Sequence, residues 1–199
     1  MAPPVLGLIL AGGQARRMGG GDKPLLRLGG LTLLERICAR LGPQCGAGLA
    51  LSVHGEAGRF AGFPGAILPD PLPGRLGPLA GILAGLEQAA AQGIFEIVSV
   101  SGDAPLLPGD LVARLQAVRP EGGIALAASG ERRHHTIALW PVSLRGDLRR
   151  YLDAGERRVG GFIARHEAAV ASWPVDPVDP FLNLNTPEDL AMAQALDLG

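Results

Sequence analysis

The chain of 199 residues carries 18 Lys and Arg against 19 Asp and Glu, so its formal net charge of -1 gives no overall field that would attract a nucleic acid. Hydrophobic residues make up 47% of the chain and aromatic residues 4%, which favours helices packed on a parallel sheet through a core of Ala, Leu, Val and Ile. The apolar segment at residues 5–11 lacks a basic leader and is too short for a signal peptide or a membrane span. We therefore expect one domain over residues 1–199, a cytoplasmic location, and no contact with nucleic acid or membrane.

The predicted elements alternate between strands and helices. Val5–Leu10 is a short apolar run that leads into Gly12-Gly13, which predicts a buried parallel strand followed by a glycine loop. Further strands are expected over residues 48–53, 66–68, 95–100, 124–128 and 136–140, and helices over residues 32–41, 79–92, 108–118 and 143–154. This alternation predicts an α/β fold with a mainly parallel central sheet flanked by helices, in which ligands bind beyond the carboxyl ends of the strands.

Two helix starts have recognisable caps. Thr32 can cap the first helix. The last helix has a fuller signature, with Thr186 as its N-cap, Pro187 as its first residue and Asp189 as the acid of a capping box. This signature directly follows Asn183-Leu184-Asn185. We expect the helix to close the domain.

The cysteines and the histidine pair do not indicate a metal site. Cys38 and Cys45 are seven residues apart with no nearby histidine, which fits neither a zinc site nor a redox motif, so we expect packing or surface thiols. His134-His135 is preceded by two arginines and lacks a third ligand nearby. We expect this pair on a loop near the substrate edge of the sheet.

The loop after the first strand has the composition of an anion site. Gly12-Gly13 is followed by Arg17-Met18-Gly19-Gly20 and by Asp22-Lys23, so a short loop combines many backbone amides with several cations. It is not a Walker A loop, because Lys23 is followed by Pro24, and it lacks the third glycine of the dinucleotide-binding fingerprint. A flexible, solvated turn is the alternative, but this order of residues after a buried strand favours phosphate binding.

Residues 10–23, LAGGQARRMGGGDK, resemble the signature of the molybdenum cofactor guanylyltransferases, which transfer GMP from GTP to molybdopterin. This motif alone indicates only a wider superfamily that includes sugar-nucleotide pyrophosphorylases and a cytidylyl relative. Two later segments narrow the choice, AGERRV at residues 154–159 and NLNTPE at residues 183–188. Further matching pieces extend the resemblance over nearly the whole chain: Asp70, GPLAG at 77–81, GDAP at 102–105, GER at 130–132 and TIAL at 136–139. The resemblance implies a Rossmann-like nucleotidyltransferase fold of the GT-A-like type.

The resemblance also implies a reaction. The terminal phosphate of molybdopterin attacks the α-phosphorus of GTP and pyrophosphate leaves, so charge must be neutralised on two polyanions. Asp103 matches the family's magnesium ligand, and a carboxylate at a strand end suits Mg²⁺ that bridges phosphates, whereas the simpler interpretation is a helix cap before Pro105. Lys23 and Arg17 would hold the β- and γ-phosphates, the alternative being solvated loop charges.

Two sets of substrate contacts follow from the same resemblance. The nucleotide contacts map onto Leu10, Ala11, Gly12, Gly13, Lys23, Ser52, Asp70 and Asp103. The family often has Asn where this chain has Ser52, so guanine would be read more by backbone groups, and Asp70 could equally be a turn residue before Pro71.

The pterin substrate would contact Arg158, Asn183 and Asn185. Arg158 can bind a phosphate with two parallel hydrogen bonds, whereas the asparagines could instead serve turn chemistry before the capped helix. One of the two asparagines could also complete the magnesium shell.

Two alternative functions stay open. One is a cytidylyltransferase for the same cofactor, which differs only in the base it selects. The other is a non-catalytic carrier of nucleotide or cofactor, although a carrier has no need of both Asp103 and Lys23. The partners that the resemblance implies are GTP, molybdopterin, Mg²⁺ as cofactor, and transient contacts with an upstream insertase and client molybdoenzymes.

Overall fold

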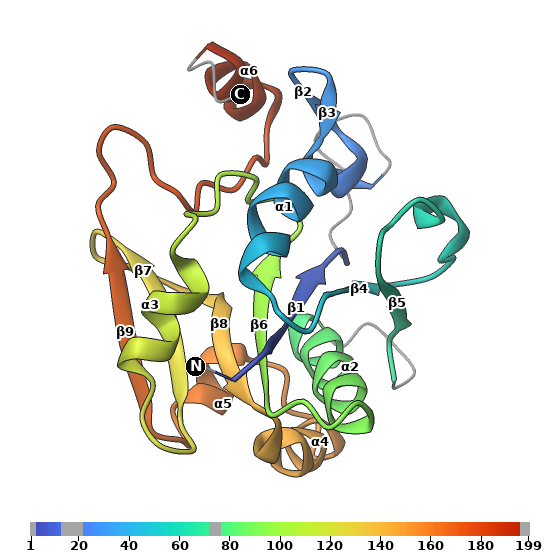
Figure 1. The fold of residues 1–199 in the computed structure, drawn as a ribbon, viewed down its shortest axis with the longest axis vertical. Coiled ribbons are helices and arrows are strands. Elements are labelled where there is room, and N and C mark those ends of the chain that lie inside the picture. The colour runs from blue at the N-terminus through green and yellow to red at the C-terminus, as the bar shows by residue number, and fades with distance from the viewer. Residues whose placement is uncertain (1–2, 13–21, 72–76, 196–199) are drawn as a thin grey trace.

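The computed structural model describes residues 3–12, 22–71 and 77–195, and two of the residues predicted at the site, Gly13 and Arg17, lie outside these ranges (Figure 1). The main sheet has seven strands in the order β5 (Ala66–Pro69), β4 (Leu49–Val53), β1 (Val5–Leu10), β6 (Glu96–Ser101), β8 (Arg132–Pro141), β7 (Ile124–Ser129) and β9 (Ala168–Trp173). β8 runs antiparallel to both of its neighbours, and every other pair is parallel. The predicted α/β fold with a mainly parallel sheet is therefore confirmed.

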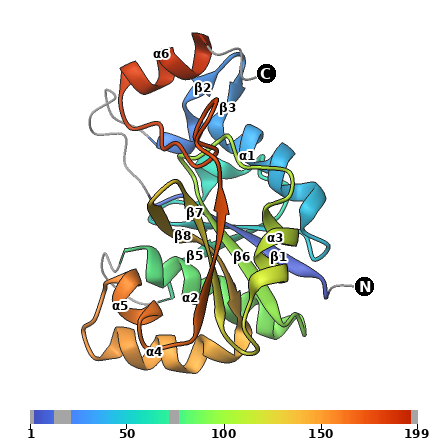
Figure 2. The same cartoon turned by 90° about the vertical axis from the view of Figure 1, so that its left-hand side faces the viewer.

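Helices cover both faces of this sheet (Figure 2). The α-helices are α1 (Leu33–Leu41), α2 (Pro78–Ala91), α3 (Leu111–Val118), α4 (Arg145–Asp153), α5 (Val159–Ile163) and α6 (Pro187–Ala195). The 3-10 helices are η2 (Lys23–Leu25), η3 (Gly42–Gln44), η4 (Gly58–Phe60) and η5 (Val142–Leu144). None of the helices in the part of the chain that the structure describes is long and apolar enough to cross a membrane.

Two hydrophobic clusters lie on opposite faces of the sheet. On one face α1 and α3 bury Ile37 and Leu115, and on the other α2, α4 and α5 bury Leu83, Leu148 and Phe162. The strands between them are nearly continuous apolar runs, as expected for a sheet that is covered on both sides.

A third, smaller cluster joins distant parts of the chain. The hairpin of β2 (Arg27–Leu28) and β3 (Leu31–Thr32) contributes Leu28, and Leu184 and Ala193 come from the segment that contains α6. In Figures 1 and 2 the hairpin and α6 lie side by side at one end of the molecule. This packing brings residues 183–195 to the part of the chain that follows the glycine loop.

The predicted caps are confirmed. Thr32 Oγ1 accepts from Glu35 N at 3.1 Å, and Glu35 Oε2 accepts from Thr32 N at 2.6 Å. At α6, Asp189 N donates to Thr186 Oγ1 at 3.1 Å and Thr186 N donates to Asp189 Oδ2 at 2.9 Å. Both helices therefore begin with their first amides satisfied by side chains.

The prediction of a loop at His134-His135 is wrong, because both residues lie within β8. The register between β7 and β8 shifts at Leu126/Ala127, and this irregularity interrupts the apolar alternation on which the strand boundary was predicted. His134 is buried, its Nε2 lies 2.7 Å from Ser129 Oγ, and burial lowers its pKa. Its role is packing against Phe181, since the two ring centroids are 4.9 Å apart.

Other boundaries differ from expectation by a few residues. The helix predicted over residues 108–118 begins at Leu111, and the one predicted over residues 143–154 consists of η5 followed by α4. The short elements β2, β3 and α5 and the last strand, β9, were not predicted. Cys45 is buried and Cys38 half-buried, and burial raises their pKa to about 12 and about 11, which confirms packing thiols.

Candidate active site

The candidate site is built where β1 and β6 end side by side. Gly102, the residue after β6, donates from its amide to the carbonyl oxygen of Leu10 at 3.0 Å. A Cβ at Gly102 would lie 2.9 Å from that oxygen and 3.0 Å from Cγ of Pro24. Glycine is therefore required here so that the backbone after β6 can approach the end of β1 and the start of η2.

This close approach places Lys23 and Asp103 together. Lys23 Nζ lies 3.3 Å from Asp103 Oδ2, and each of the two side chains is 16% exposed. Lys23 Nζ also donates to Oδ1 of Asn185. The structure thus brings together one residue from each of three predicted motifs, which are separated by 80 and 162 residues in the chain.

Asp103 is held by two further contacts. Ser101 Oγ donates to Asp103 Oδ1 at 2.6 Å, and Leu184 N donates to the backbone oxygen of Asp103 at 2.9 Å. The first contact fixes the carboxylate and the second fastens the asparagine segment to the end of β6. Ser101 was not predicted, although a hydroxyl two residues before a strand-end aspartate is a visible signal for this kind of support.

Asn185 is oriented by the cap of α6. Its backbone amide donates to Asp189 Oδ2 at 2.9 Å, and its side-chain Nδ2 donates to the oxygen of Asn183 at 3.4 Å. The amide of Asn185 is the largest cause of a lowered pKa at Asp189, and hydrogen bonds to Thr186 add to it. The turn chemistry considered for Asn183 and Asn185 is therefore present, together with a contact from Asn185 to Lys23.

The residues that were predicted to contact the nucleotide lie at the neighbouring strand ends. Ala11 N donates to the backbone oxygen of Ser52 at 2.9 Å, so the ends of β1 and β4 are joined. The Ser52 side chain is buried, and a Cβ at Gly81 of α2 would lie 3.0 Å from Ser52 Cβ. Ser52 thus packs under the first turns of α2, and its contact with a nucleotide stays a prediction.

Asp70 follows β5 and is paired with a residue that was not predicted. Asp70 Oδ2 lies 2.9 Å from His54 Nδ1, with 19% and 41% of the two side chains exposed. Arg59, in η4, forms an ion pair from Nε to Asp22 Oδ2 at 2.5 Å and donates to the backbone oxygen of His54 at 2.8 Å. The segment after β4 therefore contacts both Asp70 and the residue beside Lys23.

Arg158 lies apart from this group. It is the N-cap residue of α5, it is exposed, and its backbone oxygen accepts from Tyr151 Oη at 3.1 Å. Within the described ranges, no hydrogen bond or ion pair joins Arg158 to Lys23, Asp103 or Asn185. Figure 2 shows α5 next to α4, towards the other end of the molecule from α6. Its contact with a substrate stays a prediction.

Comparison with known proteins identifies the family of the chain. The model of the MobA-like NTP transferase domain matches residues 7–170. The chain belongs to the MobA-like NTP transferase family.

Relatives and solved structures extend this result. A molybdenum cofactor guanylyltransferase of Bradyrhizobium sp. (strain ORS 278) is 51% identical over 197 residues, which cover 96% of this chain and 92% of that protein. The crystal structure of molybdopterin-guanine dinucleotide biosynthesis protein A from Archaeoglobus fulgidus has a TM-score of 0.71 at 21% identity, covering 97% of this chain and 98% of that one. A manganese complex of the Rv0371C protein from Mycobacterium tuberculosis H37Rv has a TM-score of 0.68 at 20% identity, covering 96% and 98%. These two structures share the fold.

The donor set of this MobA-like chain fits a divalent cation that is held mainly by its substrate. Among the described residues, no three His, Cys, Asp or Glu side chains gather closely enough to hold a metal by themselves. Asp103 supplies one carboxylate, which accepts a hydrogen bond from Ser101. The side-chain oxygen of Asn185 lies nearby, because Lys23 Nζ contacts both Asn185 and Asp103. Mg²⁺ is commonly bound by one or two protein carboxylates together with substrate phosphates and water. A site with so few protein ligands therefore fits a cation that substrate phosphates help to bind.

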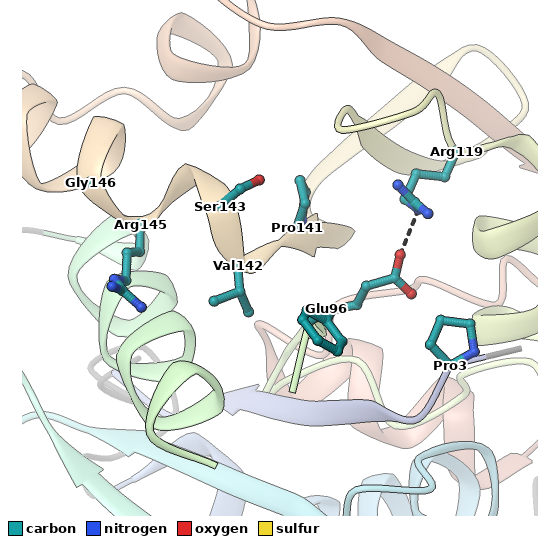
Figure 3. A pocket seen from close by; sticks show the side chains of 9 residues that line it. Pro3, Glu96, Arg119, Pro141, Val142, Ser143, Arg145 and Gly146 are labelled. Carbon is teal, nitrogen blue, oxygen red and sulfur yellow. Dashed lines mark ion pairs between the residues drawn. The ribbon is translucent and has the colours of Figure 1, made fainter. Parts of the chain in front are cut away.

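A hollow of about 690 Å³ lies at the opposite edge of the sheet (Figure 3). It is lined at the amino end of β6, where Glu96 pairs with Pro141 of β8, and at the start of α4 around Arg145. Glu96 is buried and forms an ion pair with Arg119 Nε at 2.6 Å. Because Glu96 and Ser101 are the two ends of β6, this hollow is separate from the candidate active site of the MobA-like fold.

Proposed function

We propose that the chain transfers GMP from GTP to the terminal phosphate of molybdopterin and releases pyrophosphate. The observation that carries this proposal is the contact of Lys23 Nζ with Asp103 and Asn185, since it joins the glycine loop, the strand-end carboxylate and the asparagine segment. The names of the half-identical relatives support the substrates. We place the reaction in the cytoplasm, where GTP is abundant.

Lys23 is well suited to the phosphates. It is the only lysine in a chain whose 18 basic residues are otherwise arginine. A lysine ammonium is a compact charge on a flexible stem, which can turn from Asp103 and Asn185 towards a phosphate oxygen without leaving the site. We propose that Lys23, together with Arg17, stabilises the charge that builds on pyrophosphate as it leaves.

Asp103 and Asn185 would hold the metal, which we propose to be Mg²⁺. Bound there, Mg²⁺ would neutralise charge on the phosphates and orient them. Ser101 keeps the Asp103 carboxylate in place through its 2.6 Å hydrogen bond. The hydrogen bond from Asn185 N to Asp189 Oδ2 holds Asn185 at the capped start of α6, so part of this chain's own contribution is positioning.

The direct test is transfer itself. Purified protein is incubated with Mg²⁺, molybdopterin and GTP, CTP, ATP or UTP, and the dinucleotide and pyrophosphate are quantified. We expect product with GTP and little with the other nucleotides, and loss of product in Lys23→Ala and Asp103→Ala. Arg145→Ala, which removes a cation from the opposite edge of the sheet, is the matched control and should retain full activity.

Each contrary outcome has a definite meaning. Preference for CTP would assign the chain as the cytidylyltransferase, and GTP binding without any transfer would assign it as a carrier. We further propose that Arg158 and Asn183 contact the pterin, so Arg158→Ala should raise the KM for molybdopterin while the KM for GTP stays constant. Contacts with the upstream insertase and client enzymes are proposed as transient.

A further inference from the structure

The end of β4 presents a histidine towards solvent where a polar nucleotide contact is expected. Ser52 is 5% exposed and packs against α2, so its hydroxyl is turned away from solvent. Two residues further on, His54 is 41% exposed at its side chain and lies beside Asp70. Among the described residues at the ends of β4 and β5, the His54–Asp70 pair therefore offers polar groups that solvent can reach.

The geometry of this pair fixes the roles of its atoms. His54 Nδ1 and Asp70 Oδ2 are 2.9 Å apart. An ionised carboxylate only accepts hydrogen bonds, so Nδ1 must carry the proton and donate it to Asp70. One carboxylate oxygen is thereby occupied, and the hydrogen bond restricts rotation of the Asp70 side chain. The second oxygen, Oδ1, keeps its capacity to accept from a ligand.

The backbone of His54 is also held. Arg59 donates to the His54 oxygen at 2.8 Å and to the oxygen of Glu56, while its Nε binds Asp22. Because Asp22 precedes Lys23, the segment from His54 to Arg59 connects Asp70 with the phosphate-side lysine. A substitution at His54 would consequently act on Asp70 through the side chain and leave the Arg59 contacts to the backbone in place.

We propose that His54 is a positioning residue for the nucleoside half of the substrate, which deepens and rests on the proposed function. Its imidazole holds Asp70 Oδ2 so that Oδ1 faces a donor of the nucleoside, either the 2′-hydroxyl of the ribose or the 2-amino group of guanine. Lys23 serves the phosphates, and the His54–Asp70 pair serves the nucleoside. The two tasks are therefore separable by the choice of ligand.

Calorimetric titrations with Mg²⁺ test this division. GTP and inorganic tripolyphosphate are titrated into the wild-type chain, His54→Ala, His54→Asn and Asp70→Asn. We expect His54→Ala to weaken GTP binding by about tenfold, the effect of one lost hydrogen bond to a charged group, and to leave tripolyphosphate binding unchanged. His54→Asn retains an N–H donor near the position of Nδ1 and should recover most of the GTP affinity.

Two further comparisons sharpen the result. The double variant His54→Ala/Asp70→Asn should bind GTP no worse than Asp70→Asn alone, because His54 acts through Asp70. Inosine triphosphate and 2′-deoxy-GTP identify the donor. The ligand that lacks the donor should bind the wild type and His54→Ala with the same affinity. His166→Gln, which alters a histidine that packs against Phe162 with ring centroids 4.6 Å apart, is the control for a general effect on folding.

Equal losses for GTP and tripolyphosphate in His54→Ala, or no loss for either, would overturn the inference. The same holds if His54→Asn behaves like His54→Ala while its thermal unfolding matches wild type. A wild-type chain that binds tripolyphosphate and all nucleotides equally refutes the role of the pair but leaves the phosphate site standing. A chain that binds no ligand refutes the proposed function, and the inference with it.

Discussion

Lys23 Nζ donates to the side-chain oxygen of Asn185, although the two residues are 162 positions apart. The contact depends on the packing of α6 and the β2–β3 hairpin through Leu28, Leu184 and Ala193. The C-terminal segment thus contacts Lys23, the residue that we propose to bind the phosphates. Substitutions that loosen this small cluster should affect catalysis before they affect the central sheet.

Removal of the lysine charge should impair transfer more than removal of any other single cation in the described part. We expect Lys23→Ala to lower kcat/KM for GTP by about 100- to 1,000-fold, the scale seen when one transition-state donor is lost. Lys23→Arg should recover only part of this loss, because a planar guanidinium differs from an ammonium in the contacts it can make between Asp103 and Asn185. Steady-state pyrophosphate release measures both effects, and full activity of Lys23→Ala would contradict the assigned role.

The single lysine also offers a chemical probe. An amine-reactive reagent can modify only Lys23 and the α-amino group of this chain, and mass spectrometry of peptides distinguishes them. We expect GTP with Mg²⁺ to slow the modification of Lys23 and to leave the α-amino group unaffected. Equal modification of Lys23 with and without GTP would show that the nucleotide does not cover it.

Gly102→Ala should separate the ends of β1 and β6. The added methyl would meet the Leu10 oxygen and Pro24, so either strand end or η2 must move. Such crowding costs about 1–3 kcal/mol of unfolding free energy and should displace Lys23 from Asp103. Urea denaturation and GTP titration measure the two consequences. Gly109→Ala is the control, because nothing lies within 4 Å of its added carbon, and it should leave both measurements unchanged.

Asp189 should make the affinity for molybdopterin depend on pH under acidic conditions. Hydrogen bonds from Asn185 and Thr186 lower the pKa of Asp189, so its stabilising contribution is present above its unfolded pKa and is lost as the pH falls through the lower, folded value. As the pH falls through this lowered pKa, protonation of Asp189 should release Asn185 and loosen α6.

The variant Asp189→Ala removes the same cap at neutral pH. We expect it to raise the KM for molybdopterin by about two- to fivefold, the order of one lost helix cap, and to raise the KM for GTP by a smaller factor, because Asn185 also contacts Lys23. Glu188→Ala, on the exposed first turn of the same helix, provides the comparison. A larger effect on GTP than on molybdopterin would place Asn185 on the nucleotide side instead.

The thiols should be slow to react in the folded chain. Burial raises the pKa of Cys38 to about 11 and that of Cys45 to about 12. At pH 8 the thiolate fraction of Cys38 is therefore roughly one in a thousand, and that of Cys45 is lower still. A chromogenic disulfide reagent should react promptly with both thiols only after the chain is unfolded in guanidinium. Prompt reaction of the native chain would show that α1 and η3 open readily.

The sequence predicts the parts of the site that depend on local order. A buried run that ends at glycines, an aspartate after a strand, and a Thr-Pro-Glu-Asp cap each carry their signal within a few residues, and the structure has all three. Partners such as Ser101 for Asp103, or His54 for Asp70, depend on side-chain directions at strand ends. The alternation of side chains along a strand does not predict where side chains point after the strand has ended.

The remaining differences have the same origin. The pairing of Asp22 with Arg59, and of Lys23 with Asn185, joins segments whose spacing in the chain carries no information about their distance in space. His134 was expected on a loop, and the structure places it in β8, whose register against β7 shifts between Leu126 and Ala127. Strand direction and irregular register come from tertiary packing, so they could not be derived from local pattern.

If the phosphates of GTP bind Lys23 as we propose, the lysine must exchange its present contacts for contacts with the nucleotide. Without a nucleotide, the Lys23 ammonium forms an ion pair with Asp103 and donates a hydrogen bond to Asn185. The phosphates must therefore compete with these groups, and the measured affinity reports a difference between two sets of contacts. A cation that binds Asp103 removes one competitor and frees the lysine, so metal and nucleotide should each strengthen the binding of the other by the same factor.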